Sequence, residues 1–348
     1  MHSKVSTAPF TNFSKSMALR ALFCWLALLP QIALLFVSKS WNSLLLILFC
    51  VLGTALSEAD KIIGKSDRNV ALAHSLLAGT LSGFFLPEGY PAASALLISF
   101  IFMFASRKAF GPPGVSWLNP VALTVIAAWF AGRTAFGGFI LSGADLLVKN
   151  PSMALIDGAS LSNGADEMIT AFLNDSVFRL FNVSIPNGYV SLFWDNHASI
   201  PAFRFTFMTL LASIFLFAFD IKKPEVPLFS LLIYFELVHF LSPLITGAPP
   251  MGGDMLLAML SSGALFSAFF VLQWPGTSPL TIWGKVIYSI LCGSFAFAFC
   301  GTGTSPVGAA LTILFANLTA PALQYLESKN ARKKISALVA EKLGEAEQ

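Results

Sequence analysis

Apolar residues along this chain gather into long runs that are separated by short polar stretches. Ten of these runs approach the roughly 20 residues that an α-helix needs to cross the hydrocarbon core of a bilayer. They cover residues 18–38, 41–57, 69–86, 91–107, 115–132, 202–220, 226–244, 254–273, 281–300 and 306–325. The pattern predicts an all-α polytopic membrane protein with about ten transmembrane helices.

The ten runs fall into two groups of five on either side of a long, more polar stretch at 133–201. A group with an odd number of crossings returns the chain to the opposite face of the membrane, so a repeat of such groups is inverted. We therefore expect two inverted five-helix repeats with a long loop between helices five and six. The expected segments are a cytoplasmic stretch at 1–17, the first repeat at 18–132, an extracytoplasmic loop at 133–201, the second repeat at 202–325 and a cytoplasmic tail at 326–348.

The distribution of lysine and arginine predicts the orientation of these helices. With the N-terminus placed inside, 16 of the 21 basic residues fall on the inner side. The outer side holds only Lys39, Arg133, Lys149, Arg179 and Arg204. Because loops on the cytoplasmic side carry an excess of lysine and arginine, both termini are expected in the cytoplasm.

Composition narrows the class further. Hydrophobic residues make up 56% of the chain and charged residues only 11%, and the mean hydropathy is +0.74. Soluble domains carry roughly 25% charged residues, so a cytosolic enzyme, a secreted disulfide scaffold and a nucleic-acid-binding protein are excluded. The four cysteines lie in apolar runs without a CxxC spacing, which favours buried packing over metal binding.

A glycine- and proline-rich loop joins the fourth and fifth runs, with the sequence RKAFGPPGVSWLNP at 107–120. Asn119 stands directly before Pro120, which is a typical arrangement for the N-cap of a helix. A polar side chain at membrane depth is also tolerated where it lines a cavity or is buried in protein. The sequence leaves both interpretations open for Asn119 and its neighbour Ser116.

The predicted outer loop contains the polar cluster IDGASLSNGAD at 156–166. Its small residues and hydroxyl groups would let the backbone approach a phosphate, and a serine oxygen can form a phosphoester. The same composition is also that of an ordinary turn built from aspartate, serine and glycine.

The seventh and eighth predicted membrane helices contain ionisable residues that could serve ion movement. Glu236 and His239 share one face of the seventh run, and Asp254 lies near the start of the eighth. Such groups are costly in lipid, so they are candidates for relaying protons or coordinating a cation. The alternative is a hydrogen-bonded pair that fixes the packing of helices.

These segments occur in an order that resembles the RnfD/NqrB family. The pattern includes the loop at 247–254 and the eighth run, where Ala268, Phe269 and Phe270 are followed by Gln273 and Trp274. The family comprises membrane subunits of Rnf electron-transport complexes and of the sodium-translocating NADH:quinone reductase. The resemblance covers roughly residues 70–325, and the length is closer to that of RnfD than to that of the longer NqrB.

The resemblance implies a flavoprotein. Family members carry FMN on a threonine of an outer-loop motif D-G-x-S-G-A-T, and they can hold a second, non-covalent flavin such as riboflavin among the helices. By this resemblance Asp157, Ser160 and Ser162 form the FMN attachment region, although Asn163 stands where the threonine belongs. The looser match to the helix-five motif assigns Lys108, Ser116 and Asn119 to the second flavin.

The function implied by the resemblance is that of a divergent member of the family. It would be a multi-pass subunit in the bacterial inner membrane that relays electrons through flavin and helps to conduct Na⁺ or H⁺ along Glu236, His239 and Asp254. Its partners would be the other membrane and peripheral subunits of an Rnf- or Nqr-type complex. Two alternatives remain: a solute channel or transporter on the same scaffold, and a structural subunit without flavin.

Overall fold

The membrane-protein prediction is confirmed by the helices of the chain. The computed structural model describes residues 15–64, 67–136, 164–181, 184–246, 250–301 and 305–346, and no strand occurs within these ranges. Five helical segments have the length and hydropathy of membrane spans, namely Met17–Val37, Ala92–Phe110, Glu225–Ile245, Ile282–Gly301 and Gly308–Ala337. Shorter apolar helices cover Trp41–Ser57, Pro120–Ala131 and Thr206–Ala218. The chain is a polytopic α-helical membrane protein.

The first group of helices packs around α3. Its members are α1 (Met17–Leu26), α2 (Leu29–Val37), α3 (Trp41–Ser57), α4 (Ala59–Gly64), α5 (Arg68–Phe84), α6 (Ala92–Phe110) and α7 (Pro120–Ala131). The central helix α3 contacts both α5 and α6, and α1 lies against α5. Two glycines let α5 approach α3 closely: a Cβ at Gly79 would lie 2.4 Å from the Cα of Val51, and one at Gly83 would lie 2.6 Å from that of Ile47. Small residues four apart are a common means of close helix packing in membranes.

The second group is built around the pair α12 and α15. Its elements are α11 (Thr206–Ala218), α12 (Glu225–Thr246), α13 (Met255–Ser261), α14 (Ala264–Phe266), the π-helix η5 (Ser267–Val271), α15 (Ile282–Ala296), the π-helix η6 (Phe297–Gly301) and α16 (Gly308–Ala346). Helix α15 packs against α12 on one side and α16 on the other. Helix α16 continues through the predicted tail without a break.

The eighth apolar run differs from the single helix that its composition predicts. It is divided into α13, α14 and η5 because Gly263 adopts a φ of +68°, a conformation that ends α13. A Cβ at this position would lie 2.2 Å from the ring of Phe203. The aromatic ring therefore occupies the space that a side chain at 263 would need.

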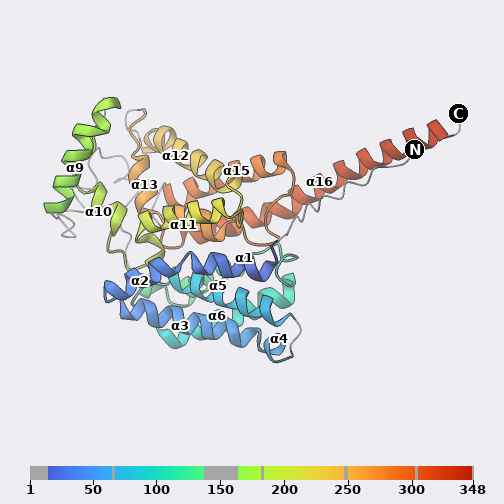
Figure 1. Cartoon of the computed structure of the whole chain (residues 1–348), viewed down its shortest axis with the longest axis horizontal. Helices are drawn as coiled ribbons and strands as arrows, with labels where there is room; N and C mark the ends of the chain where they lie inside the picture. Colours follow the sequence, from blue (N-terminus) through green and yellow to red (C-terminus); the bar gives the residue numbers. More distant parts are fainter. Residues whose placement is uncertain are drawn as a thin grey trace, which may run out of the picture.

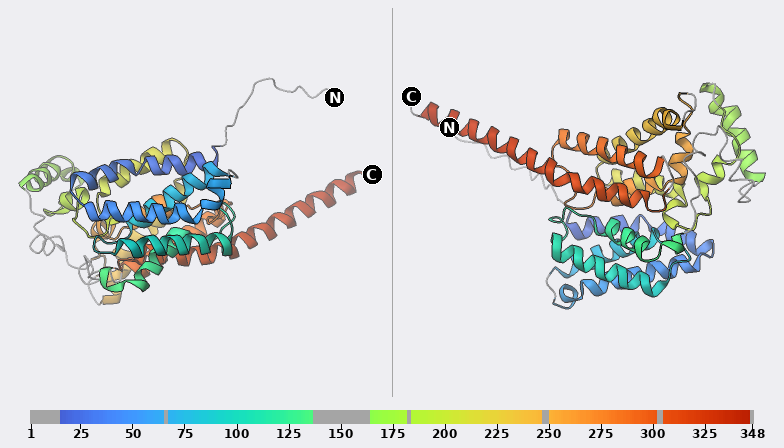
Figure 2. Two further views of the ribbon diagram at one scale, coloured as in Figure 1. Left: turned by 90° about the horizontal axis from the view of Figure 1, so that it is seen from below. Right: turned by 180° about the vertical axis from the view of Figure 1, so that it is seen from behind.

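The elements described from the predicted outer loop lie together at one end of the molecule. They are η1 (Arg133–Phe136), α9 (Gly164–Ser176), η3 (Phe178–Phe181), α10 (Tyr189–Trp194) and η4 (Pro201–Phe203). Helices α9 and α10 stand at the end opposite to the one from which α16 projects (Figures 1 and 2). The long axes of the apolar helices run between these two ends.

The two helical groups lie side by side (Figure 1). Buried hydrogen bonds join them: the side-chain amide of Gln31 in α2 donates to the hydroxyl of Thr209 in α11 at 2.7 Å. Helix α7 of the first group also packs against α16 of the second. The boundary between the groups is where the candidate site lies.

Candidate functional site

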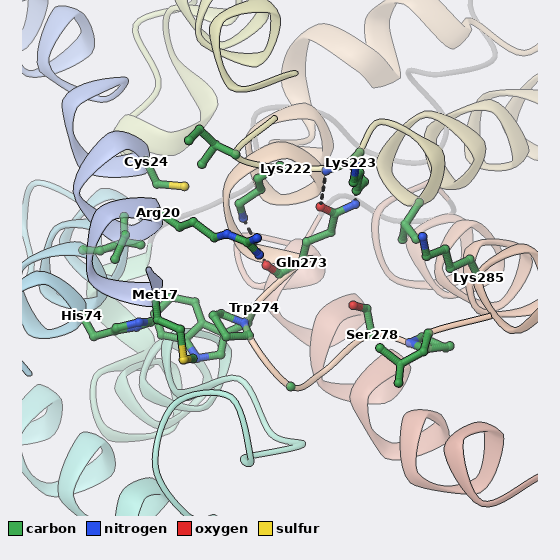
Figure 3. A pocket seen from close by; sticks show the side chains of 18 residues that line it. Met17, Arg20, Cys24, His74, Lys222, Lys223, Gln273, Trp274, Ser278 and Lys285 are labelled. Atoms are coloured by element: carbon green, nitrogen blue, oxygen red, sulfur yellow. Dashed lines mark hydrogen bonds between the residues drawn. The ribbon is translucent and has the colours of Figure 1, made fainter. Parts of the chain in front are cut away.

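A cavity of about 430 Å³ lies between the two helical groups, at the end of the molecule where α1 begins and from which α16 projects (Figure 3). Three parts of the chain that are far apart in sequence form its walls: α1 and α5 of the first group, the connection between α11 and α12, and the loop that follows η5. Residues contributed by these elements include Arg20, His74, Lys222, Lys223 and Trp274, and Lys285 of α15 (Ile282–Ala296) also lines the cavity.

The lining of this cavity is basic. Four cationic side chains line it, and no aspartate or glutamate is among its described lining residues. Two of the four have carboxylate partners outside the lining: Lys223 pairs with Asp220 at 2.7 Å, and Lys285 pairs with Glu225 at 3.1 Å. The other two, Arg20 and Lys222, make no ion pair with a carboxylate among the described residues, and Arg20 contributes more weakly than Lys223 to the lowered pKa of Asp220.

Lys222 is an almost completely buried cation, with 9% of its surface exposed. Its Nζ donates hydrogen bonds to the carbonyl oxygens of Phe270 at 2.8 Å and of Gln273 at 3.4 Å, at the end of η5. Burial lowers the pKa of Lys222. The carbonyl groups at a helix end carry partial negative charge and therefore favour the ammonium form.

His74 and Trp274 form the inner wall of the cavity. Each is 2% exposed, and their rings meet edge to face at 5.7 Å between centroids. Neither ring nitrogen of His74 has a hydrogen-bond partner among the described residues. A buried polar atom without a partner is costly, so the ring nitrogens are available to a bound molecule.

The predicted second-flavin residues lie behind or away from this cavity. Asn119 caps α7: its Oδ1 accepts from the backbone N–H of Val121 at 2.9 Å, and its Nδ2 donates to the carbonyl of Val271 at 2.8 Å. Ser116 donates to the carbonyl of Leu118 at 2.9 Å. Both side chains are buried and are not among the lining residues. Of the two interpretations of Asn119, the structure shows the N-cap.

Lys108 lies on the surface, with its ammonium 5.6 Å from the centroid of the Phe104 ring. The loop that carries Ser116 supports the cavity wall from outside instead. The N–H of Gly114 donates to the carbonyl of Pro275 at 3.3 Å. At Gly276, where φ is +94°, a Cβ would lie 2.6 Å from the carbonyl oxygen of Ser116. The loop at 111–119 therefore positions the loop that follows η5.

The three predicted ion-path residues are only partly brought together. His239 Nδ1 lies 3.1 Å from the carbonyl oxygen of Gly253, which directly precedes Asp254. Asp254 caps α13 by accepting from the N–H of Leu257 at 2.9 Å, and it also accepts a hydrogen bond from the hydroxyl of Tyr189. Glu236 is exposed on the surface of α12 and makes no ion pair with His239.

The predicted FMN attachment residues Asp157, Ser160 and Ser162 lie outside the described residues. Helix α9, which starts directly after them, is anchored through Asp166. The Asp166 carboxylate accepts from the N–H of Gly188 at 2.8 Å and from the N–H and hydroxyl of Ser191, each at 2.6 Å. Burial opposes ionisation, but these hydrogen bonds hold the pKa of Asp166 below its ordinary value.

Sequence reasoning did not assemble the cavity residues into a site. Arg20 and His74 carried a signal, since each is an ionisable side chain within a predicted membrane run. Lys222 was counted only among the inner-side cations, and Trp274 only as part of the pattern that resembles the family. Their convergence depends on the contact between the two helical groups, which composition and spacing do not encode.

The fold and the cavity define a polytopic membrane protein in which two helical groups enclose a basic site at one end of the molecule. The chain belongs to the NQR2, RnfD, RnfE family, whose pattern matches residues 4–333.

Its relatives include proteins named as the D subunit of an ion-translocating oxidoreductase complex. The protein of this name from Escherichia fergusonii is 23% identical, over 92% of this chain and 96% of the relative. The one from Escherichia coli is 25% identical and the one from Shigella boydii 24% identical, with the same coverage of both chains.

Proposed function

We propose that this chain is the RnfD-type membrane component of an ion-translocating oxidoreductase complex in the bacterial inner membrane. The observation that carries the proposal is the family match over residues 4–333, together with relatives named as that component and aligned over nearly their whole length. The five membrane spans agree with this role. Its partners would be the other membrane and peripheral subunits of an Rnf- or Nqr-type complex.

The proposed topology is ten crossings in two inverted five-helix repeats with both termini in the cytoplasm. Corresponding contacts support the repeat, because α3 packs on α6 as α12 packs on α15, and α6 packs on α7 as α15 packs on α16. The orientation is supported by the basic, exposed part of α16, which carries Lys329 and Arg332 and projects away from α9 (Figure 2).

We further propose that FMN is attached to the outer segment that precedes α9, at Ser162 or, failing that, Ser160. The flavin would supply the electron-transfer chemistry when bound, and the chain would hold and orient it. The support is the retained Asp157–Gly158 pair and the anchoring of α9 through Asp166, which would fix the end of the attachment segment relative to the membrane helices.

Attachment is tested by expressing the chain with its flavin transferase and measuring flavin fluorescence in a denaturing gel. Fluorescence should be present in the unmodified chain, lost in Ser162→Ala and retained in the control Ser176→Ala, which changes an exposed serine of α9. Fluorescence that survives in both Ser162→Ala and Ser160→Ala would remove this segment as the attachment site.

The residues assigned to a second flavin do not fit as its direct ligands. The side-chain oxygen and one N–H of Asn119 and the donor of Ser116 are engaged within the protein, and Lys108 lies on the surface. We therefore assign no step of electron transfer to riboflavin at this place.

For ion movement, we propose a path that involves Glu236, His239 and Asp254 at a boundary with another membrane subunit. Glu236 lies near the middle of the 22-residue apolar helix α12, and its neighbours Phe229, Leu232 and Phe240 are exposed with it. A carboxylate facing lipid at that depth is costly. Contact with a partner subunit or with a passing Na⁺ or H⁺ would remove that cost.

The proposed function as a whole is tested by purifying the tagged chain from its native membranes. Copurification of redox subunits together with bound flavin is the expected result, whereas the subunits without flavin would indicate a purely structural role. Solute uptake by liposomes that contain only this chain would contradict the proposal and favour a transporter.

A further inference from the structure

The cavity between the two helical groups has the properties of an anion site, and they are independent of any flavin on the outer loop. We propose that it binds the phosphate group of a phosphorylated ligand between Arg20 and Lys222, with the rest of the ligand against Trp274. The side chain of Arg20 extends from α1 across the cavity, and Lys222 enters from the connection between α11 and α12 (Figure 3).

The charges in the cavity support an anionic ligand. Lys223 and Lys285 form ion pairs with Asp220 and Glu225, whereas Arg20 and Lys222 form none in the described parts of the chain, and Arg20 is only weakly offset by Asp220. Two cations that face one cavity repel each other, and an anion between them removes the repulsion.

Hydrogen-bond donors are also left over. The ammonium of Lys222 has three donors and donates to two carbonyl groups. The guanidinium of Arg20 carries five donors in a planar fork that matches a phosphate, and it makes no hydrogen bond within the described chain. These donors come from two different walls of the cavity, and the ends of the two side chains converge in Figure 3, so they can contact one phosphate group together.

A second observation points to a ligand at the same place. His74 is 2% exposed, it lines the cavity, and neither of its ring nitrogens has a protein partner within the described residues. Buried polar side-chain atoms nearly always have a partner in folded proteins. A hydroxyl or ester oxygen of the ligand next to the phosphate would provide one for His74.

The size and location of the cavity restrict the source of the ligand. A volume of about 430 Å³ is in the range of small-molecule sites. Leu280 of the lining and its neighbours Ile282 and Trp283 are 86%, 79% and 78% exposed, and tryptophan is enriched at membrane surfaces. A phosphate there can belong to an anionic phospholipid headgroup or to a soluble phosphate compound.

The experiment is native mass spectrometry of the full chain in detergent, with phosphatidylglycerol or phosphatidylcholine of the same acyl chains. In parallel, the thermal unfolding of the chain is measured with increasing inorganic phosphate. The variants are Arg20→Gln and Lys222→Gln. The matched controls are Arg332→Gln and Lys329→Gln, which remove the same charges from the exposed part of α16.

We expect at least one probe, phosphatidylglycerol or inorganic phosphate, to bind about tenfold more weakly to Arg20→Gln than to the unmodified chain or the controls. A tenfold loss of affinity corresponds to the loss of one charged hydrogen bond. If Arg20→Gln weakens the binding of phosphatidylglycerol alone, the ligand is a lipid headgroup. If the substitution weakens the binding of inorganic phosphate, the ligand is a soluble phosphate compound. Equal binding of both probes by Arg20→Gln and Arg332→Gln overturns the proposal. If Lys222→Gln does not fold, the Arg20→Gln variant alone decides the test, because Arg20 is exposed and its replacement should not prevent folding.

Discussion

The side-chain amide of Asn119 donates a hydrogen bond to the backbone carbonyl of Val271 at 2.8 Å, and this bond joins the start of α7 to the end of η5 across the boundary between the two helical groups. The same side chain caps α7 with its oxygen. One completely buried residue therefore serves both a helix end and the contact between the groups.

Replacing Asn119 by alanine should lower the stability of the chain by about 1–3 kcal/mol, because the cap is lost and a buried carbonyl is left without a donor. Asn119→Ser keeps an N-cap oxygen but not the contact to Val271, so its loss should be smaller. The measurement is thermal unfolding in detergent, with the exposed Asn330→Ala as control. Equal unfolding temperatures for Asn119→Ala and Asn330→Ala would contradict this account.

The close packing of α5 on α3 predicts that a larger side chain at their contact lowers the stability of the chain. Gly79→Ala introduces a methyl group 2.4 Å from the Cα of Val51, and backbone atoms must move to admit it. We expect a destabilisation of about 1–3 kcal/mol, as is typical of overpacking. Gly64→Ala is the control, because no atom lies within 4 Å of a Cβ at that position. An unfolding temperature for Gly79→Ala at or above that of the unmodified chain would show that the helices can separate without cost.

The anchoring of α9 should depend on pH. The pKa of Asp166 lies below its ordinary value of 3.8 in the folded chain, so the carboxylate stabilises the fold fully above the ordinary value. That contribution is lost as the pH falls through the lowered pKa. Limited proteolysis at 164–195, with an acid-stable protease such as pepsin, should therefore accelerate as the pH drops below about 4.

Asp166→Asn provides the control for this pH dependence. The amide cannot ionise, so a protease active at neutral pH should cut the variant faster than the unmodified chain. The variant should also lack the additional acceleration in acid. A variant with the same acid response as the unmodified chain would assign the pH dependence to another group.

Neutralising Glu236 should separate ion coupling from folding. Glu236 is exposed and makes no described hydrogen bond, so Glu236→Gln should leave the thermal stability of the isolated chain unchanged or slightly higher. In the reconstituted complex we expect the ion gradient to fall several-fold. Glu167→Gln removes a comparable exposed charge from α9 and should leave the gradient intact. Normal gradient formation by Glu236→Gln would exclude this residue from the ion path.

Much of the helical framework follows from local sequence. The run at 91–107 corresponds to α6 at Ala92–Phe110, and the Asn–Pro pair at 119–120 marks the start of α7, because a polar cap and a proline are both favoured at a helix beginning. The division of the run at 254–273 could not be predicted. Its apolar composition continues through Gly263, and the break depends on the ring of Phe203, which lies 60 residues earlier.

The candidate site was less accessible to sequence reasoning for a related reason. Arg20 and Trp274 are 254 residues apart in the sequence, and only the packing of the two helical groups brings them to one cavity. Local patterns report the burial and capping of a residue well, as for Asn119. They do not report which distant charges share a space, or that Lys222 is held at the end of a π-helix.

The 39 residues of α16 form one continuous helix, whose length at 1.5 Å per residue is about 58 Å. Because the hydrocarbon core is only about 30 Å thick, close to half of this helix stands clear of the bilayer. A water-soluble protein approaching that membrane face meets a charged rod before it reaches the body of the molecule. The inner half of the same helix packs on α7 and α15, so a partner protein that binds and displaces its outer half would act on both helical groups directly.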